Sequence, residues 1–271
     1  MVYTFKTYLL ASSLLLTTQS FSQTEDWEVY MARYEKGPSS TIVNMVIKQI
    51  APNLNFPFLF SAGVNFTNCT NDGLPAPGEL DNLNRISDSV VAVLNRSVKN
   101  VIVGTFTYQC QRRDYFYVAD TTGLRQQIID LLSKYFPKYT PAFNVKPDKD
   151  WAAYLEFLYP NEETFNYMQN EKVLMQLQNA GDKLEKERQV DHWLYFKTES
   201  DRECFIQYAT QAHFKLESKE KDVTLALPFK LQLSRIDKVD APTINKITLE
   251  LRKQAKKCKG DYDGWETFVI K

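Results

Sequence analysis

The chain offers few side chains for acid–base or nucleophilic chemistry, because its 271 residues include only two histidines and four cysteines. His192 stands in an alternating apolar run, where a histidine with a structural hydrogen bond is more common than a catalytic one. His213 follows a predicted helix and is expected to face water. Cys204 could act as a nucleophile beside a histidine, but no catalytic-cysteine signature surrounds it. We therefore predict no catalytic residue.

Metal and cofactor sites are equally weakly indicated. The carboxylates of segment 260–266 gather around two glycines, which could suggest calcium, but their spacing matches no EF-hand loop. The more ordinary interpretation is a helix stop followed by a tight turn in which Tyr262 and Trp265 pack. No cysteine pair has zinc spacing, and the sequence contains no glycine-rich phosphate loop and no Gly-x-Ser-x-Gly elbow. We expect neither a metal nor a cofactor.

The balance of charged residues limits the class of binding partner. Lys and Arg together number 33, as do Asp and Glu, so the chain has no net field to attract nucleic acid or an anionic membrane. We expect no direct contact with nucleic acid and favour a partner made of protein or a small molecule. The length suits two domains of about 100 to 150 residues each.

The N-terminal segment has the order of a secretory signal. A lysine precedes the apolar run 8–17, and Ser20 and Ser22 stand at the minus-three and minus-one positions of a cut before Gln23. The apolar run is too short to span a bilayer, and no cysteine follows the cut to carry a lipid, so no stable membrane anchor is expected. We predict that residues 1–22 are a signal peptide and that the mature protein is periplasmic or secreted.

The first half, residues 23–160, is predicted to be an α+β domain. Its expected elements, in order, are a strand from Trp27, a helix over 39–50, a strand over 56–66, a helix over 83–94, a hairpin turning near Gln111, a helix over 124–135 and a strand over 151–157. Counted from Phe56, the order is strand, helix, strand, strand, helix, strand. This is the ferredoxin-like order.

The second half, residues 161–271, repeats that order after a leading helix. The expected elements are a helix over 162–180, a strand over 190–197, a helix over 199–211, strands over 213–217 and 223–233, a helix over 240–258 and a strand over 265–270. We therefore predict an α+β protein of two tandem ferredoxin-like (βαββαβ) domains, each an antiparallel sheet with helices on one face.

The cysteines suggest two pairings in an exported protein. In the predicted order the two helices of the second half run antiparallel on one face of the sheet. Cys204, early in the first helix, should then lie beside Cys258, late in the second, and we predict a disulfide between them. Cys69 and Cys110 could form a second bridge near one end of the first sheet. For Cys204 and Cys258, two buried thiols are the alternative.

The second half also carries two recognisable motifs, GDKLEKERQVDHWLYF over 181–196 and DYDGWETFV over 261–269. With them it resembles the RraB family, regulators of ribonuclease E activity, except that Glu266 stands where that family tends to have glycine. The resemblance implies inhibition of ribonuclease E by binding, without chemistry. The motif residues are Gly181, Asp182, Asp191, His192, Tyr195, Phe196, Asp261, Tyr262, Asp263, Gly264 and Trp265.

The first half resembles a bacterial family of unknown function, the one numbered six hundred and ninety-five. The segments that carry the likeness are DWEVYMARY, NDGLPAPGELDNL, VGTFTYQCQRRDYFYVAD and DWAAYLEFLYP. This family often precedes an RraB-like domain, so the two resemblances support each other. The resemblance implies no particular reaction.

Three functions follow as expectations. The first is an exported, non-catalytic protein that binds another protein through a sheet or helix face. The second is an exported enzyme or small-ligand binder with a site between the domains; a deep cleft gathering Arg112, Arg113, Asp114 and Asp120 would favour it. The third is direct inhibition of ribonuclease E, which is cytoplasmic, and it requires the N-terminal segment to remain uncut.

Overall fold

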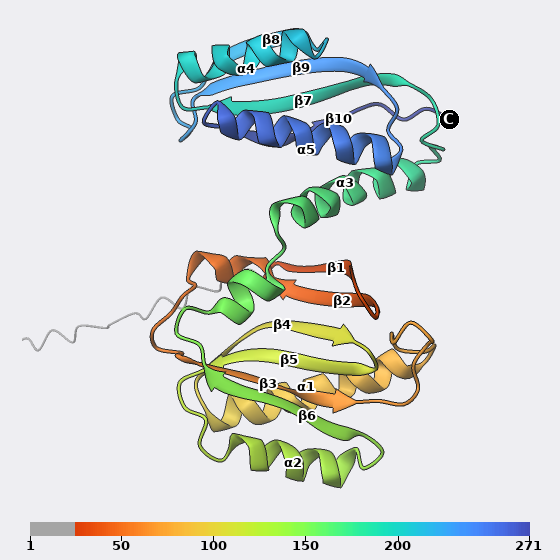
Figure 1. The fold of residues 1–271 in the computed structure, drawn as a ribbon, viewed down its shortest axis with the longest axis vertical. Helices are drawn as coiled ribbons and strands as arrows, with labels where there is room; N and C mark the ends of the chain where they lie inside the picture. The colour runs from red at the N-terminus through yellow and green to blue at the C-terminus, as the bar shows by residue number, and fades with distance from the viewer. Residues whose placement is uncertain (1–24) are drawn as a thin grey trace, which may run out of the picture.

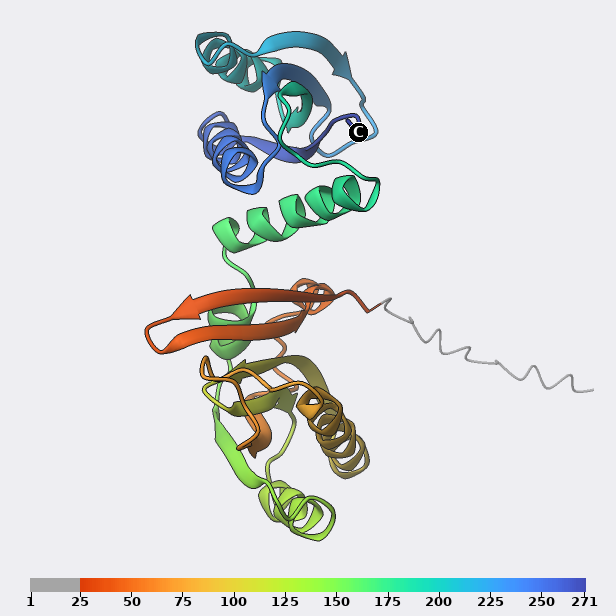
Figure 2. The same ribbon diagram turned by 90° about the vertical axis from the view of Figure 1, so that its right-hand side faces the viewer.

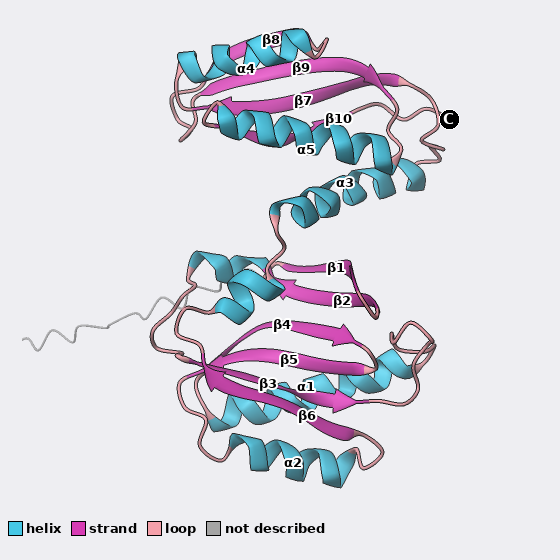
Figure 3. Ribbon diagram, viewed as in Figure 1, coloured by secondary structure: helices cyan, strands magenta, loops and turns pink. Residues whose placement is uncertain are grey.

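The computed structural model describes residues 25–271, so the predicted signal peptide and its cleavage site between Ser22 and Gln23 lie outside the described residues. Within that range the protein has two antiparallel sheets and flanking helices, which confirms the α+β class. Figures 1 and 3 show the two sheets one above the other, with the helix α3 (Glu162–Asn179) running between them.

The first sheet has six strands in the order β1-β2-β4-β5-β3-β6, with all neighbours antiparallel. The helices α1 (Glu79–Ser97) and α2 (Leu124–Tyr135) cover one of its faces (Figure 1). The strands are β1 (Trp27–Tyr34), β2 (Gly37–Asn44), β3 (Phe58–Asn65), β4 (Asn100–Tyr108), β5 (Gln111–Val118) and β6 (Thr140–Pro147).

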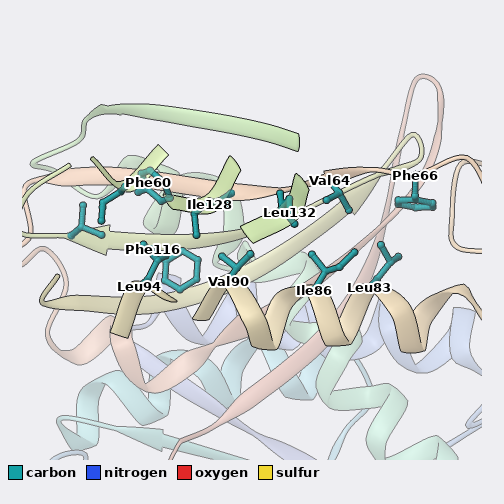
Figure 4. Close-up of a cluster of buried hydrophobic side chains, with 13 residues drawn as sticks. Phe60, Val64, Phe66, Leu83, Ile86, Val90, Leu94, Phe116, Ile128 and Leu132 are labelled. Carbon is teal, nitrogen blue, oxygen red and sulfur yellow. The ribbon is translucent and has the colours of Figure 1, made fainter. Parts of the chain in front are cut away.

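The core beneath these helices follows from two periodicities. Along β3, every second residue from Phe60 to Val64 faces the helices, as expected for a pleated strand. Along α1, Ile86, Val90 and Leu94 return to one side at helical spacing and meet the strand side chains (Figure 4). The members drawn in that view are fully or almost fully buried, so the part of this face that lies beneath the two helices is closed to solvent.

The opposite face of the first sheet is covered by the segment after β6, which contains a π-helical turn over Ala153–Leu158. Trp151 stacks on Tyr117 with ring centroids 3.9 Å apart, and its indole Nε1 donates to the carbonyl of Phe56. Asp148 accepts hydrogen bonds from the Tyr117 hydroxyl and from the N–H of Ala153. The predicted strand over 151–157 is therefore wrong, because Trp151 has φ 56 and the chain turns to lay its aromatic side chains on the sheet.

The predicted helix over 39–50 is also wrong. A two-residue turn after Tyr34 returns the chain antiparallel to β1, so residues 37–44 form β2. A run of β-branched side chains over 41–43 favours this extended conformation. Only Met45–Gln49 is helical, as a short 3-10 turn that the side chain of Asn44 caps by accepting from the N–H of Val46.

The second sheet has four strands in the order β10-β7-β9-β8, and all neighbours are antiparallel. The helices α4 (Glu199–Gln211) and α5 (Ala241–Lys257) cover one face (Figure 1), and α3 packs against α5. The strands are β7 (Arg188–Phe196), β8 (Lys215–Lys221), β9 (Phe229–Asp237) and β10 (Gly260–Glu266).

Three predicted strands of this half are displaced. The predicted strand 213–217 is β8 at 215–221, the strand 223–233 is β9 at 229–237, and the strand 265–270 is β10 at 260–266. Val223 and Leu225 lie exposed in the connection before β9. Their alternation in the sequence therefore does not mark a strand with a buried face. The helix α5 ends one turn before Gly260, which leaves that glycine free to begin the last strand.

Candidate functional site

The predicted disulfide candidates lie in pairs. The Cα atoms of Cys204 and Cys258 are 5.8 Å apart and their sulfur atoms are bonded, which joins the first turns of α4 to the end of α5. Cys69 and Cys110 are joined in the same way, also with Cα atoms 5.8 Å apart. Cys110 occupies the tight turn between β4 and β5, so this bridge ties the loop before α1 to the hairpin that was predicted near Gln111.

Most motif residues of the second half are buried where they fix its frame. Asp182 follows Gly181, which ends α3 with φ +93, and its carboxylate forms a buried ion pair with Arg188. Arg188 Nη2 lies 3.0 Å from Asp182 Oδ1, and the carboxylate also accepts from the N–H of Leu184 and of Ile270. The hydrogen bond from Arg188 holds the pKa of Asp182 well below its usual range. This cluster joins the end of α3 to the start of the first strand, β7, and to the segment that follows the last strand, β10.

His192 is buried in β7, in accord with a structural histidine. Its Nδ1 lies 2.9 Å from the hydroxyl of Tyr262, and its ring meets Phe214 edge to face. Its Nε2 has no hydrogen-bond partner among residues 25–271. Burial, with a smaller effect from Arg235, lowers the pKa of His192 to about 3, so the imidazole is neutral near pH 7. A buried neutral ring enclosed by aromatic side chains has no path to a substrate.

Trp265 and α3 are joined by a buried polar network. The indole Nε1 of Trp265 donates to Asn170 Oδ1 over 2.8 Å, and the amide of Asn170 donates to Thr248 Oγ1 and to Asn245 Oδ1, each over 2.7 Å. A second link runs from Arg252 Nε to Asn166 Oδ1 over 3.1 Å. Every donor and acceptor of the buried Asn170 amide is thereby satisfied, so α3 is held to α5 and β10 as part of the second half.

Phe196 and Gly264 complete the set of structural motif residues. Phe196 lies in the core under α4, and a Cβ built on the facing Gly260 would come within 2.3 Å of its ring. Only glycine permits this close approach of the two strands. Gly264 lies at the register shift of β10, where Tyr262 and Gly264 face consecutive residues of β7.

Several motif residues lie on the open side of the second half, where they are half-buried or exposed. Asp191 accepts from Gln232 and Gln189 on the sheet face that no helix covers. Beside that face lies a pocket of 590 Å³. Its lining includes Tyr195, Asp261, Tyr262, Asp263, Arg252 and Phe165. Arg252 already binds Asn166 and the carbonyl of Tyr262, so the pocket presents carboxylates without a free basic group opposite.

No group of three or more His, Cys, Asp or Glu side chains in the described part of the chain is placed to hold a metal ion. In the same part of the chain, no helix combines the length and the apolar character that a membrane crossing requires.

The four charged residues proposed to mark a ligand cleft do not converge. Asp114 is buried, accepts from Thr105 Oγ1 over 2.7 Å, and has a pKa raised by its burial. Arg112 lies on the same side of β5 and donates to Asn84 of α1, whereas Arg113 faces the other side of the strand. Asp120 is exposed and accepts from the N–H of Thr121. The four side chains thus face different surroundings and do not gather in one cleft.

A groove between β1 and α3 was not predicted. It has a volume of 690 Å³ and lies where the first strand of one half faces the helix of the other. Its strand wall is Glu28, Val29, Tyr30, Met31, Ala32 and Arg33, and its helix wall is Thr164, Tyr167, Met168, Glu171, Lys172 and Met175. A sequence signal existed, because Tyr167, Met168 and Met175 form an apolar stripe at helical spacing beside the stripe that packs on α5.

Comparison with known families places each half. Residues 168–267 match the family described as Regulator of ribonuclease activity B (RraB), and residues 25–159 match the Family of unknown function (DUF695). Both resemblances predicted from the motifs are confirmed. The first of these matches begins inside α3, in agreement with the attachment of that helix to the second half. A search of curated proteins found no match to the chain.

Proposed function

We propose, from the match of residues 168–267 to a family of ribonuclease regulators, that this chain is a non-catalytic protein that regulates another protein by binding it. The observation that carries the proposal is that the motif residues have structural roles. Asp182, His192 and Trp265 are buried and hydrogen-bonded within the frame of the second half. The residues on which the resemblance to this family rests are thus used to hold the fold together, which supports a role in binding over a role in a reaction.

We also infer that both halves are ferredoxin-like. The second half has the element order βαββαβ, and its sheet places the fourth strand, β10, beside the first, β7, followed by the third and the second. The last four strands of the first half follow the same rule in the order β6-β3-β5-β4. In this half, β1 and β2 are an additional hairpin at the edge of the sheet.

Export is part of the proposal and has its own test. We expect the mature chain to begin at Gln23, because Ser20 and Ser22 are the small residues that a signal peptidase requires after an apolar run. N-terminal sequencing of the protein from cells and from the exported fraction decides the point. A chain that begins at Met1 and stays in the cytoplasm would instead support direct inhibition of ribonuclease E.

The binding proposal is tested by capture and reconstitution. The mature chain is immobilised and exposed to the exported protein fraction, bound proteins are identified by mass spectrometry, and each is purified and titrated against the free chain. We expect at least one purified protein to bind with a defined stoichiometry. The residues 161–271 alone serve as a matched bait, which shows whether the RraB-like half is sufficient.

A second candidate function has one supporting observation. The groove between β1 and α3 is of the size that small ligands occupy and is lined in part by apolar side chains. If the chain were an exported small-ligand binder, small molecules extracted from the exported fraction would raise its thermal midpoint, and no purified protein would bind it. The combination of these two results would replace the regulatory proposal.

A further inference from the structure

The strand β1 is the outer strand of the first sheet and has one free hydrogen-bonding edge. The N–H of Met45 donates to the carbonyl of Asp26 over 2.8 Å, which fixes the pairing phase of the hairpin. Because hydrogen-bonded and non-bonded pairs alternate in an antiparallel ladder, the backbone groups of residues 27, 29, 31 and 33 point away from β2. No other residue of the range 25–271 pairs with them.

The strand itself has few of the features that usually discourage strand addition, although Glu28 and Arg33 are charged and α3 runs along the edge at the distance of a groove. It is eight residues long and contains no proline, no lysine and no bulge. Two apolar side chains beside the unpaired groups are exposed, Val29 at 59% and Met31 at 55%. A long, regular edge with exposed apolar residues is a favourable template for another strand.

The helix α3 forms the facing wall of the groove. Figures 1 and 2 both show this helix running alongside β1. Its residues Tyr167 and Met175 are exposed and turn toward the strand, while Lys172 forms an ion pair with Glu28 across the groove. Methionine side chains adapt their shape to different apolar neighbours. The helix wall can therefore pack against apolar side chains of different shapes.

We propose that the groove receives an extended peptide segment of a partner protein, which adds as a strand to the free edge of β1. The backbone of the segment pairs with the open N–H and C=O groups of Val29 and Met31, and its alternate apolar side chains pack on Tyr167 and Met175 of α3. This inference deepens the proposed regulatory function and rests on it, since it names the surface and the kind of partner.

The groove geometry favours this occupant over two others. A small molecule cannot satisfy a row of backbone groups spaced along a strand, whereas an extended chain matches their repeat of about 3.3 Å per residue. A second copy of this chain would have to bring its own β1 into the groove, but its own α3 lies along that same edge. Glu28 and Glu171 are balanced by Arg33 and Lys172, so the groove has no net charge to attract a charged segment, and its apolar side chains favour an apolar one.

The test uses a proline substitution at an outward-facing position. Met31→Pro removes one N–H from the free edge and leaves the pairing with β2 intact, because the N–H of residue 31 points away from β2. Met31→Ala is the matched control, since it also removes the side chain but keeps the N–H. Thermal unfolding of both variants and of the parent shows whether the hairpin remains folded. If the proline variant is unfolded, Val29→Pro with Val29→Ala provides the same comparison.

The probe is a displayed library of random seven-residue peptides selected against the mature chain, and selected peptides are measured by fluorescence polarisation. We expect peptides with apolar residues at every second position, bound about tenfold more weakly by Met31→Pro than by Met31→Ala, because a lost hydrogen bond leaves a peptide carbonyl unpaired. Met175→Lys should weaken the same peptides through the helix wall.

Several results would overturn the inference. Equal binding by Met31→Pro and Met31→Ala would show that the edge is not used, and so would the absence of any selected peptide. A dimer of the parent chain that Met31→Pro dissociates would assign the edge to a second copy. A captured partner that binds Met31→Pro as well as it binds the parent would leave the regulatory function standing and reject this surface. Absence of any partner would instead reject the regulatory function.

Discussion

Buried ionisable side chains of the second half determine how its stability depends on pH. His192 has a pKa of about 3 in the folded protein, lowered by burial from its ordinary value of 6.5. Asp182 has its pKa lowered by the hydrogen bond from Arg188. In both cases the unfolded chain takes up a proton at a higher pH than the folded chain, so acidification favours unfolding.

For His192 the effect falls in a range where carboxylates contribute little. Its stabilising contribution is complete above pH 6.5 and is lost as the pH falls from 6.5 toward 3, because only the unfolded state is protonated there. We expect the free energy of unfolding to fall by about 2 kcal/mol between pH 7 and pH 5. Urea unfolding at a series of pH values measures this slope.

Two variants test whether His192 causes this pH dependence of the free energy of unfolding. His192→Phe should remove it whatever its effect on absolute stability, whereas His213→Asn should keep it. Asparagine is chosen for the second because residue 213 has φ 61, a conformation that asparagine tolerates. A slope that persists in His192→Phe would contradict a buried neutral imidazole.

The buried ion pair should be worth far more than an exposed pair. Asp182→Asn leaves the guanidinium of Arg188 buried without its counter-charge, and we expect a loss of about 3 kcal/mol in the free energy of unfolding. Glu203→Gln is the control, because Glu203 and Lys219 are about half exposed, and it should cost less than about 1 kcal/mol. Equal costs in denaturant titrations would show that Asp182 is not an anchor.

The sequence identified the motif residues but not what each of them does. His192 could be recognised as structural from its place in an apolar alternation, because a strand with one buried face buries every second residue. The partnership of Trp265 with Asn170 could not, because 95 residues separate them and no local pattern links their positions. The groove was missed for a related reason, since its two walls come from segments more than 100 residues apart.

At the scale of elements, the disulfide between Cys204 and Cys258 fastens α4 to α5. Both helices lie on one face of the second sheet, and the bridge closes a loop of 54 residues. Predicting this pairing required only the element order, because consecutive helices in that order run antiparallel on the same face. The register of the strands was harder to predict, since exposed alternation at Val223 and Leu225 looks the same in sequence as buried alternation.

Removing the bridge should destabilise the second half alone. Replacement of Cys204 and Cys258 by serine should lower its free energy of unfolding by about 2 to 4 kcal/mol, because the unfolded chain regains the freedom of a long loop. Replacement of Cys69 and Cys110 should instead affect the first half. Denaturant unfolding followed by mass spectrometry of peptides reports both transitions. Free thiols at positions 204 and 258 in protein purified without reductant would contradict the bridge.

At the scale of the whole molecule, close packing between elements runs within each half. The chain passes from one half to the other through Pro160 and Asn161, where the Asn161 side chain caps α3 by accepting from the N–H of Thr164. The helix α3 belongs to the second half through Asn166 and Asn170, although it follows directly on the last turn of the first half.

We therefore expect residues 23–160 and 161–271 to fold separately when expressed alone. Each should unfold cooperatively, because each has its own buried core. A division after residue 180 is the matched control, since it removes α3 from the second half and leaves Trp265 Nε1 without Asn170. Calorimetry should give a sharp transition for 161–271 and a weakened one for 181–271. The reverse order would place the boundary on the other side of α3.

The two walls of the groove belong to separately packed halves, and the short link at Pro160 sets how often they meet. A tether of a few residues keeps two bodies at a mutual effective concentration in the millimolar range. Cutting the chain at this link would therefore turn a single binding event into a ternary assembly, in which the peptide must bring strand and helix together. The apparent affinity for the peptide would then depend on the concentration of both halves. A protease that cleaves at this link would release the bound peptide without cleaving β1 or α3.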